Sequence, residues 1–210
     1  MKYAFYVSGN AGRLRKILKR QEKFLKEVKV VISDDSRNAD IEEELKNIGI
    51  DFVLYNFRDL PSNKNVYLSD QILSTLQKYA IDYCFSFGDH ILKGRLLYEY
   101  KDRIINFHPS LLPMYKGRMA IDQALEENSF LLGCSAHFIN DGMDAGPVIM
   151  QAVMSKEIYR KSGYDGVLDT QIDMLKKIIS AINEGRITIS HDEVEIADAD
   201  YSNVCFFPIV

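Results

Sequence analysis

The chain has 210 residues, of which 47% are hydrophobic and 27% are charged. This composition supplies enough apolar surface for a sizeable core, so we expect mainly one domain with little disorder. The formal net charge of −4 gives no general attraction for nucleic acid. No apolar run approaches the roughly eighteen residues of a membrane span. The cysteines lack metal-ligand spacing, which favours reduced thiols and a cytoplasmic location; they are Cys84, Cys134 and Cys205.

The first half of the chain alternates strand-length apolar segments with helical patterns. The predicted strands are Tyr3–Val7, Lys29–Ser33, Phe52–Tyr55, Tyr83–Phe87 and Arg103–Phe107. The predicted helices cover the interval from Leu14 to Val28, Ile41–Ile48 and Ser69–Tyr79, with Ser69 as the N-cap residue. This alternation predicts an α/β fold with a doubly wound, mostly parallel sheet and helices on both faces.

The second half continues with a predicted helix, two strands and a long helix. They are Ala120–Glu127, Leu131–Phe138, Val148–Met154 and Val167–Ile182, the last stopped by Gly185. The apolar terminus Val204–Val210 should be packed on its own domain or on a partner, which makes it a candidate homodimer contact.

An amide and an imidazole stand two residues apart where a buried strand ends. Ile104 and Ile105 require an extended backbone, and Pro109 stops it, so Asn106 and His108 should emerge on one face. The loop Asn140–Pro147 presents a carboxylate, Asp144.

These three side-chain types suit acyl transfer, in which donors stabilise an oxyanion and a carboxylate assists proton movement. Ser110 lacks the turn of a nucleophilic serine, so we expect direct attack by a substrate amine. Singly, His108 fits a hydrogen-bonded strand end and Asp144 fits a turn carboxylate equally well or better. Only their joint context points to catalysis.

The sequence resembles the folate-dependent formyltransferases, and among them the small glycinamide ribonucleotide formyltransferases. The resemblance is specific over residues 84–154 and is carried by Asn106–Pro113, Tyr115–Gly117, Gln123–Leu125, Gly133–Phe138 and Asp144–Gln151. It implies a Rossmann-like formyltransferase domain over residues 1–190, with residues 191–210 as a C-terminal tail.

The resemblance also implies the chemistry. The donor would be 10-formyltetrahydrofolate and the acceptor a primary amine on a small, phosphorylated molecule, with no metal. Asn106 and protonated His108 would hydrogen-bond the oxyanion, while Asp144 would tune His108 and assist proton transfer.

Two segments correspond to the family's folate pocket. The implied residues are His90, Ile91, Leu92 and Leu97, and then Ile139, Asn140, Asp141, Gly142 and Met143. His90 stands where relatives can carry an arginine, so its contact with the folate tail competes with a solvated-loop role. For His137 we favour a structural, hydrogen-bonded role.

The acceptor side departs from the family pattern. The implied acceptor residues are Gly9, Asn10, Ala11, Gly12, Arg13, Pro109 and Gln171. The first turn corresponds to a phosphate-binding Gly-Asn turn, yet a plain strand–helix connection explains it as well. Gln171 stands where the family carries an acceptor-binding Glu, and an amide cannot supply that charge.

Several functions therefore compete. Formyl transfer to glycinamide ribonucleotide is favoured weakly over formyl transfer to an amino-sugar nucleotide, which Gln171 and Arg13 favour. Formyltetrahydrofolate hydrolysis and non-catalytic folate binding are further alternatives, although the related hydrolases usually carry an added N-terminal domain. Formylation of methionyl-tRNA is disfavoured because that family carries an extra C-terminal domain.

Overall fold

A computed structural model describes residues 1–204 and 207 of the chain. These residues form two compact units, Met1–Asn106 and Phe107–Val210, and each unit is described by itself. Among the described residues, no helix is both long and apolar enough to cross a bilayer. The expected packing of the terminus Val204–Val210 falls mostly on residues outside the described part.

The first unit is built on a parallel sheet. Its strands run in the order β3-β2-β1-β4-β5. They are β1 (Tyr3–Val7), β2 (Val28–Ser33), β3 (Asp51–Leu54), β4 (Tyr83–Phe87) and β5 (Ile104–His108), whose last two residues enter the second unit. The five predicted strands are confirmed to within one residue at each end.

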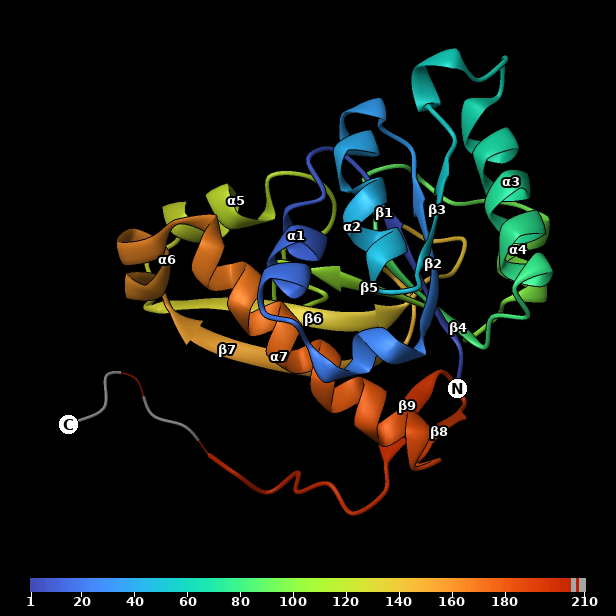
Figure 1. The fold of residues 1–210 in the computed structure, drawn as a ribbon. Helices are drawn as coiled ribbons and strands as arrows, with labels where there is room; N and C mark the ends of the chain where they lie inside the picture. Colours follow the sequence, from blue (N-terminus) through green and yellow to red (C-terminus); the bar gives the residue numbers. More distant parts are fainter. Residues whose placement is uncertain (205–206, 208–210) are drawn as a thin grey trace. The chain divides into compact units, whose positions relative to one another are not determined.

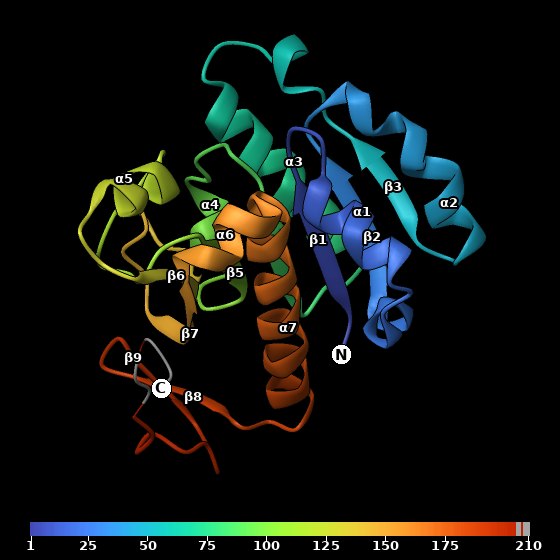
Figure 2. The same cartoon turned by 90° about the vertical axis from the view of Figure 1, so that its left-hand side faces the viewer.

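Helices cover both faces of this parallel sheet. Figures 1 and 2 show α1 (Gly12–Lys19) and α2 (Glu42–Asn47) on one face of β1–β3, and α3 (Lys64–Lys78) and α4 (Arg95–Glu99) on the other. Because the chain winds outward from β1 to β3 and then returns to β4, the sheet is doubly wound and reverses between β1 and β4. The predicted fold class is confirmed.

The core of the first unit is aromatic. All five residues of β1 are buried, and Phe5 packs its ring against the rings of Phe24, Phe85 and Phe87. A strand buried on both faces carries a continuous apolar run rather than an alternating one. This is why Tyr3–Val7 reads as a strand from its sequence.

Two helix predictions are wrong in detail. The interval from Leu14 to Val28 is not one helix, because α1 ends at Lys19 and Gln21 takes a positive φ of 50° before a 3-10 turn over Lys23–Glu27. Ser69 is not an N-cap: α3 begins at Lys64, and the Ser69 hydroxyl donates to the Asn65 carbonyl inside the helix, 2.7 Å away.

The described part of the second unit contains two antiparallel strand pairs and three helices. Strand β6 (Leu131–Phe138) pairs with β7 (Val148–Ser155), and β8 (Ile187–Ser190) pairs with β9 (Glu193–Ile196). Helix α7 (Tyr164–Asn183) packs on β6 and β7, α6 (Lys156–Ser162) packs on α7, and α5 (Ala120–Glu126) packs on β6. Helices α4 and α6 and strands β8 and β9 were not predicted from the sequence.

Candidate functional site

Strand β5 delivers the predicted amide and imidazole. Ile104 and Ile105 are buried, and the strand ends at His108 because Pro109 has no N–H to continue a ladder. Asn106 and His108 are two residues apart on this strand, so their side chains leave the same face. Asn106 is half-buried and His108 is only 5% exposed.

Both ring nitrogens of His108 face oxygen atoms. Nε2 lies 2.7 Å from the carbonyl oxygen of Tyr115, and Nδ1 lies 3.4 Å from Oδ2 of Asp144. A neutral imidazole carries only one N–H, so the doubly protonated ring is the form that donates to both oxygens. The predicted neighbourhood of His108 and Asp144 is present in the structure.

The Asp144 carboxylate is held from several sides. Its Oδ2 accepts the backbone N–H of Gly117 at 2.7 Å, and its Oδ1 lies 3.6 Å from Nε2 of His137. These contacts hold the pKa of Asp144 at about 2, with His137 the largest cause, ahead of the Gly117 N–H and the charge of His108, and against the effect of burial. Asp144 is therefore ionised across the physiological pH range.

The loop that carries Asp144 depends on a close backbone approach. A Cβ at Gly146 would lie 1.9 Å from the carbonyl oxygen of Phe138, so only glycine fits there. Asp144 itself has a φ of 45°, a left-handed conformation that non-glycine residues seldom adopt. The connection between β6 and β7 thus folds back on the end of β6 and presents the carboxylate.

His137, for which a structural role was favoured from the sequence, contacts the Asp144 carboxylate. It is 2% exposed, and its Nδ1 lies 2.9 Å from the Phe138 carbonyl while Nε2 faces Asp144. The available signal was the prediction of two consecutive strands, Leu131–Phe138 and Val148–Met154, joined by the loop that carries Asp144. Their antiparallel pairing returns this loop to the strand end that carries His137.

A side-chain network fixes the segment after β5. The Ser135 hydroxyl donates to the Ser110 carbonyl at 2.7 Å and accepts the Leu112 N–H at 2.9 Å. The Gln151 amide donates to the Leu112 carbonyl, also at 2.9 Å. Since the Tyr115 carbonyl follows directly, this network helps to set the position of the His108 ring.

The predicted acceptor turn lies in the first unit at the reversal point of the sheet. Gly12 begins α1 and donates its N–H to Oδ1 of Asn10, 3.1 Å away, while Ala11 has a φ of 50°. The Arg13 guanidinium lies 4.5 Å from the centre of the Phe87 ring. The turn also meets the loop after β4, because the Asp89 N–H donates to the Ser8 hydroxyl at 3.0 Å.

The predicted donor residues of the first unit follow that loop. Ile91 is 50% exposed, whereas Leu92 and Leu97 are buried at 4% and 7%. His90 is packed rather than solvated: its ring stacks on Phe57 with centroids 3.5 Å apart, and its Nε2 lies 3.7 Å from a carboxylate oxygen of Asp34.

Asp34 is a buried carboxylate that contacts His90. It is 3% exposed and accepts hydrogen bonds from the hydroxyls of Tyr6 and Ser8. Burial raises the pKa of Asp34, and these hydrogen bonds oppose the rise. Asp34, Tyr6 and Ser8 were not predicted as neighbours of His90, because no local spacing links them.

The remaining predicted residues lie in the second unit. Residues 139–143 precede Asp144, with Asn140 accepting the Gly142 N–H at 3.0 Å and Met143 62% exposed. Gln171 on α7 is fully buried, and its amide donates to the Phe107 carbonyl at 3.4 Å. It contacts the backbone of β5 between Asn106 and His108.

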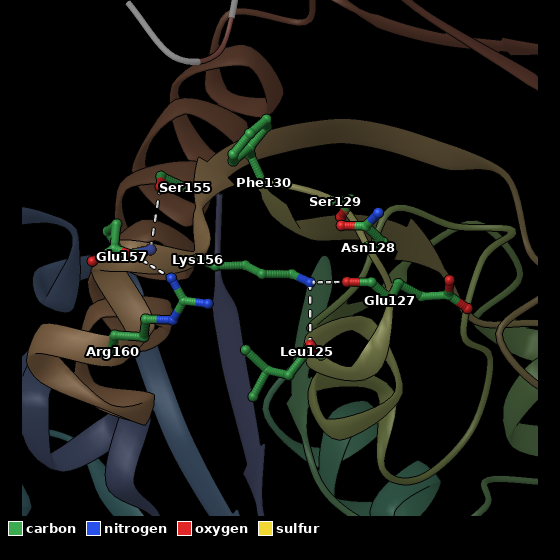
Figure 3. Close-up of a pocket in the computed structure, with 9 residues that line it drawn as sticks. All are labelled: Leu125, Glu127, Asn128, Ser129, Phe130, Ser155, Lys156, Glu157 and Arg160. Carbon is green, nitrogen blue, oxygen red and sulfur yellow. Dashed lines mark hydrogen bonds and ion pairs between the residues drawn. The ribbon is translucent and has the colours of Figure 1, made fainter.

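A separate pocket in the second unit surrounds the start of α6 (Figure 3). Lys156 is 4% exposed, and its ammonium donates to the carbonyls of Leu125 and Glu127 at 3.3 and 2.6 Å. A lysine that donates to the last carbonyls of a helix caps it, so Lys156 ties the end of α5 to α6. Among residues 1–204 and 207, no group of three or more His, Cys, Asp or Glu side chains is placed to hold a metal ion.

Comparisons with known proteins identify relatives of this chain. A relative is the trifunctional purine biosynthetic protein adenosine-3 of Homo sapiens, 30% identical over 70% of this chain, which spans 15% of that protein. Another is the phosphoribosylglycinamide formyltransferase of Escherichia coli (strain K12), 40% identical over 39% of each chain. The chain thus spans less than two thirds of these curated relatives.

A solved structure is similar over almost the whole chain. It is the glycinamide ribonucleotide transformylase 1 of Symbiobacterium toebii, with a TM-score of 0.79, 29% identity and 94% coverage of each chain. The model of the family described as formyl transferase matches residues 1–161, which include β5, the loop before β7 and all three predicted catalytic residues. The chain therefore belongs to the formyl transferase family.

Proposed function

We propose that this chain moves a formyl group from 10-formyltetrahydrofolate to the primary amine of a small phosphorylated acceptor, with glycinamide ribonucleotide the favoured acceptor. The observation that carries the proposal is the contact of the buried His108, where β5 ends, with the half-buried Asp144; the same strand also carries Asn106. Two of the similar proteins, named phosphoribosylglycinamide formyltransferase and glycinamide ribonucleotide transformylase 1, support it.

The reaction needs donors at an oxygen that gains charge. The acceptor amine adds to the formyl carbon, the carbonyl electrons move to oxygen, and the tetrahedral adduct collapses with loss of the folate nitrogen. One proton leaves the amine and one reaches the departing nitrogen, so the folate product is tetrahydrofolate. Hydrogen bonds from Asn106 and His108 that strengthen as the oxyanion forms would lower this barrier.

His108 has to exchange one hydrogen bond during this reaction. Its Nε2 faces the Tyr115 carbonyl and its Nδ1 faces Asp144. Donation from Nε2 to substrate oxygen therefore replaces the bond to Tyr115, while Asp144 continues to stabilise the charged ring. Asp144 is suited to this role because its pKa is held at about 2, so it stays ionised while His108 gains and loses a proton.

We propose that residues 90–92 and 97 of the first unit and residues 139–143 of the second unit each contribute groups that bind the donor, and that the first turn holds the acceptor phosphate. Exposed apolar side chains such as Ile91 and Met143 can pack on a flat heterocycle. The catalytic domain is assigned to residues 1–190, the tail to residues 191–210, and the protein to the cytoplasm, in line with the buried free thiols of Cys84 and Cys134.

An amino-sugar nucleotide is the second candidate acceptor. It is favoured by Gln171, whose neutral amide cannot supply the charge of the Glu that the family carries there, and by Arg13, which can pair with phosphate at the first turn.

The test is release of tetrahydrofolate, measured spectroscopically, with each acceptor in turn and with none. Turnover with glycinamide ribonucleotide supports the favoured acceptor, and turnover only with amino-sugar nucleotides selects the second candidate. Release that is equally fast without an amine would replace the proposal with hydrolysis. His108→Ala should lose most turnover and keep donor affinity, whereas His191→Ala, on an exposed turn, should keep both.

A further inference from the structure

His137 is a buried imidazole with an oxygen at each ring nitrogen. Nδ1 lies 2.9 Å from the Phe138 carbonyl oxygen, and Nε2 lies 3.6 Å from Oδ1 of Asp144. The ring is 2% exposed, so rotation would remove it from both oxygens and leave their positions unfilled in a water-poor site. The position of His137 is therefore set by β6.

The Asp144 carboxylate has a different partner on each oxygen. Oδ2 accepts the Gly117 N–H and faces Nδ1 of His108, while Oδ1 faces His137. Two imidazoles from two strands thus face the two different oxygens of one carboxylate. A carboxylate with only one of these partners could turn about its Cβ–Cγ bond, and its distance to His108 would no longer be fixed.

The backbone of Asp144 makes a side-chain anchor necessary. Asp144 has a φ of 45°, and a non-glycine residue persists there only when its surroundings hold it. Gly146 closes the loop on the Phe138 carbonyl, and His137 is the residue that precedes Phe138 in β6. The same strand end therefore holds the loop through its backbone and the carboxylate through a side chain.

We propose that His137 is a positioning residue for formyl transfer, which acts through Asp144 by holding the carboxylate in the orientation that keeps His108 a donor. This inference rests on the proposed function, because it gives Asp144 and His108 their roles in that reaction. His137 itself need not touch either substrate. This positioning role accounts for a second buried histidine at a site where one imidazole would suffice for the chemistry.

The electrostatics agree with the geometry. His137 is the largest cause of the low pKa of Asp144, followed by burial in the opposite direction, the Gly117 N–H and the charge of His108. Within the described residues, the groups that face this carboxylate are His137 from β6, His108 from β5 and the Gly117 N–H from the segment before α5. Removing the first of them should raise the pKa of Asp144.

The first test needs no activity. The carboxyl carbon of Asp144, assigned from the spectrum of Asp144→Asn, is titrated by carbon-13 NMR in the natural chain, in His137→Phe and in His137→Gln. We expect His137→Phe to raise the pKa of Asp144 by about one pH unit or more, and His137→Gln, which keeps a donor near Nε2, to raise it less. An unchanged titration in His137→Phe would overturn the proposal.

The second test separates positioning from folding. His137→Phe should lower kcat on the order of 10–100-fold with little change in the KM of the donor, and the acid limb of the pH profile of kcat should move to higher pH. His137→Gln should recover most of kcat, and the control His191→Gln should match the natural chain. Equal losses in both His137 variants, in proportion to a fall in Tm, would mean a structural role only. If the natural chain transfers formyl to no amine, the proposed function fails while the NMR result still stands.

Discussion

The His108 ring is positioned as much by backbone groups as by its carboxylate partner. The Tyr115 carbonyl oxygen lies within hydrogen-bond distance of Nε2, the Gly117 N–H donates to the Asp144 carboxylate, and the same carboxylate faces Nδ1. At the scale of single residues, the site thus depends on side chains and on the backbone of residues 115–117 together. Preorganised groups of this kind need little rearrangement when charge develops on a substrate.

Asn106 should act only in the transition state. Replacing Asn106 by Ala removes one oxyanion donor, so we expect kcat to fall on the order of 10²–10³-fold with donor affinity nearly unchanged. Steady-state kinetics and a donor-binding titration measure the two quantities. The control is Asn203→Ala, an exposed amide on the C-terminal segment, which should leave both unchanged. Loss of donor binding in Asn106→Ala would assign Asn106 to binding rather than to catalysis.

The low pKa of Asp144 predicts part of the acid sensitivity of the fold. The folded pKa is about 2, below the value of about 3.9 for an unfolded aspartate. The stabilisation is therefore fully present above pH ~4 and is lost as the pH falls towards 2. We expect the free energy of unfolding of Asp144→Asn to fall less steeply over this window than that of the natural chain.

Denaturant unfolding at a series of pH values measures this difference. A comparison of variants is needed because other carboxylates titrate in the same range. Asp35, paired with Arg37, also has a pKa lowered to about 2, whereas burial raises the pKa of Asp34. Parallel curves for the natural chain and Asp144→Asn would show that the His137 and His108 contacts do not stabilise the ionised form.

Lys156 shows at the scale of elements how a helix end is fixed by a distant side chain. Its ammonium donates to the Leu125 and Glu127 carbonyls at the end of α5 (Figure 3), and its own N–H donates to the Phe130 carbonyl at 2.8 Å. One residue at the start of α6 thus satisfies groups on both sides of the connection from α5 to β6. The Lys156 side chain is itself buried, so these hydrogen bonds also satisfy a charge that would otherwise be destabilising.

Lys156→Met should therefore destabilise the fold without direct damage to the chemistry. Two carbonyls lose a charged donor, so we expect a loss of about 1–3 kcal/mol in the free energy of unfolding and a near-natural kcat. The control is Lys161→Met on the exposed face of the same helix, which should change stability by less than about 0.5 kcal/mol. Equal effects in the two variants would contradict the capping role.

The elements also show where sequence reasoning succeeds and fails. Strands of the parallel sheet are predictable because burial on both faces gives continuous apolar runs, as in Tyr3–Val7 and Tyr83–Phe87. The end of α1 at Lys19 is not predictable in this way. The helical spacing of apolar residues continues in the sequence through a turn that depends on the positive φ of Gln21. Ser69 misleads because its hydroxyl serves both the Asn65 carbonyl and the Lys93 N–H within the fold.

For the whole chain, alternation of strands and helices was enough to predict an α/β fold. The pairing of His108 with Asp144 followed from a strand end and a loop that share residue types with a known family. The contact of Asp34 with His90 joins residues far apart in the sequence, and no local pattern predicts it. The contact of His137 with Asp144 spans only the connection between β6 and β7, and it depends on how these two strands pair.

The proposed function requires that the formyl carbon is transferred to an amine. Carbon-13 NMR follows this transfer in a reaction with 10-formyltetrahydrofolate labelled at the formyl carbon and glycinamide ribonucleotide as acceptor. We expect the label to appear as an N-formyl amide, one for each tetrahydrofolate released, and His108→Ala to lose most of this signal. Label that appears as free formate at the same rate with and without acceptor would show hydrolysis instead of transfer.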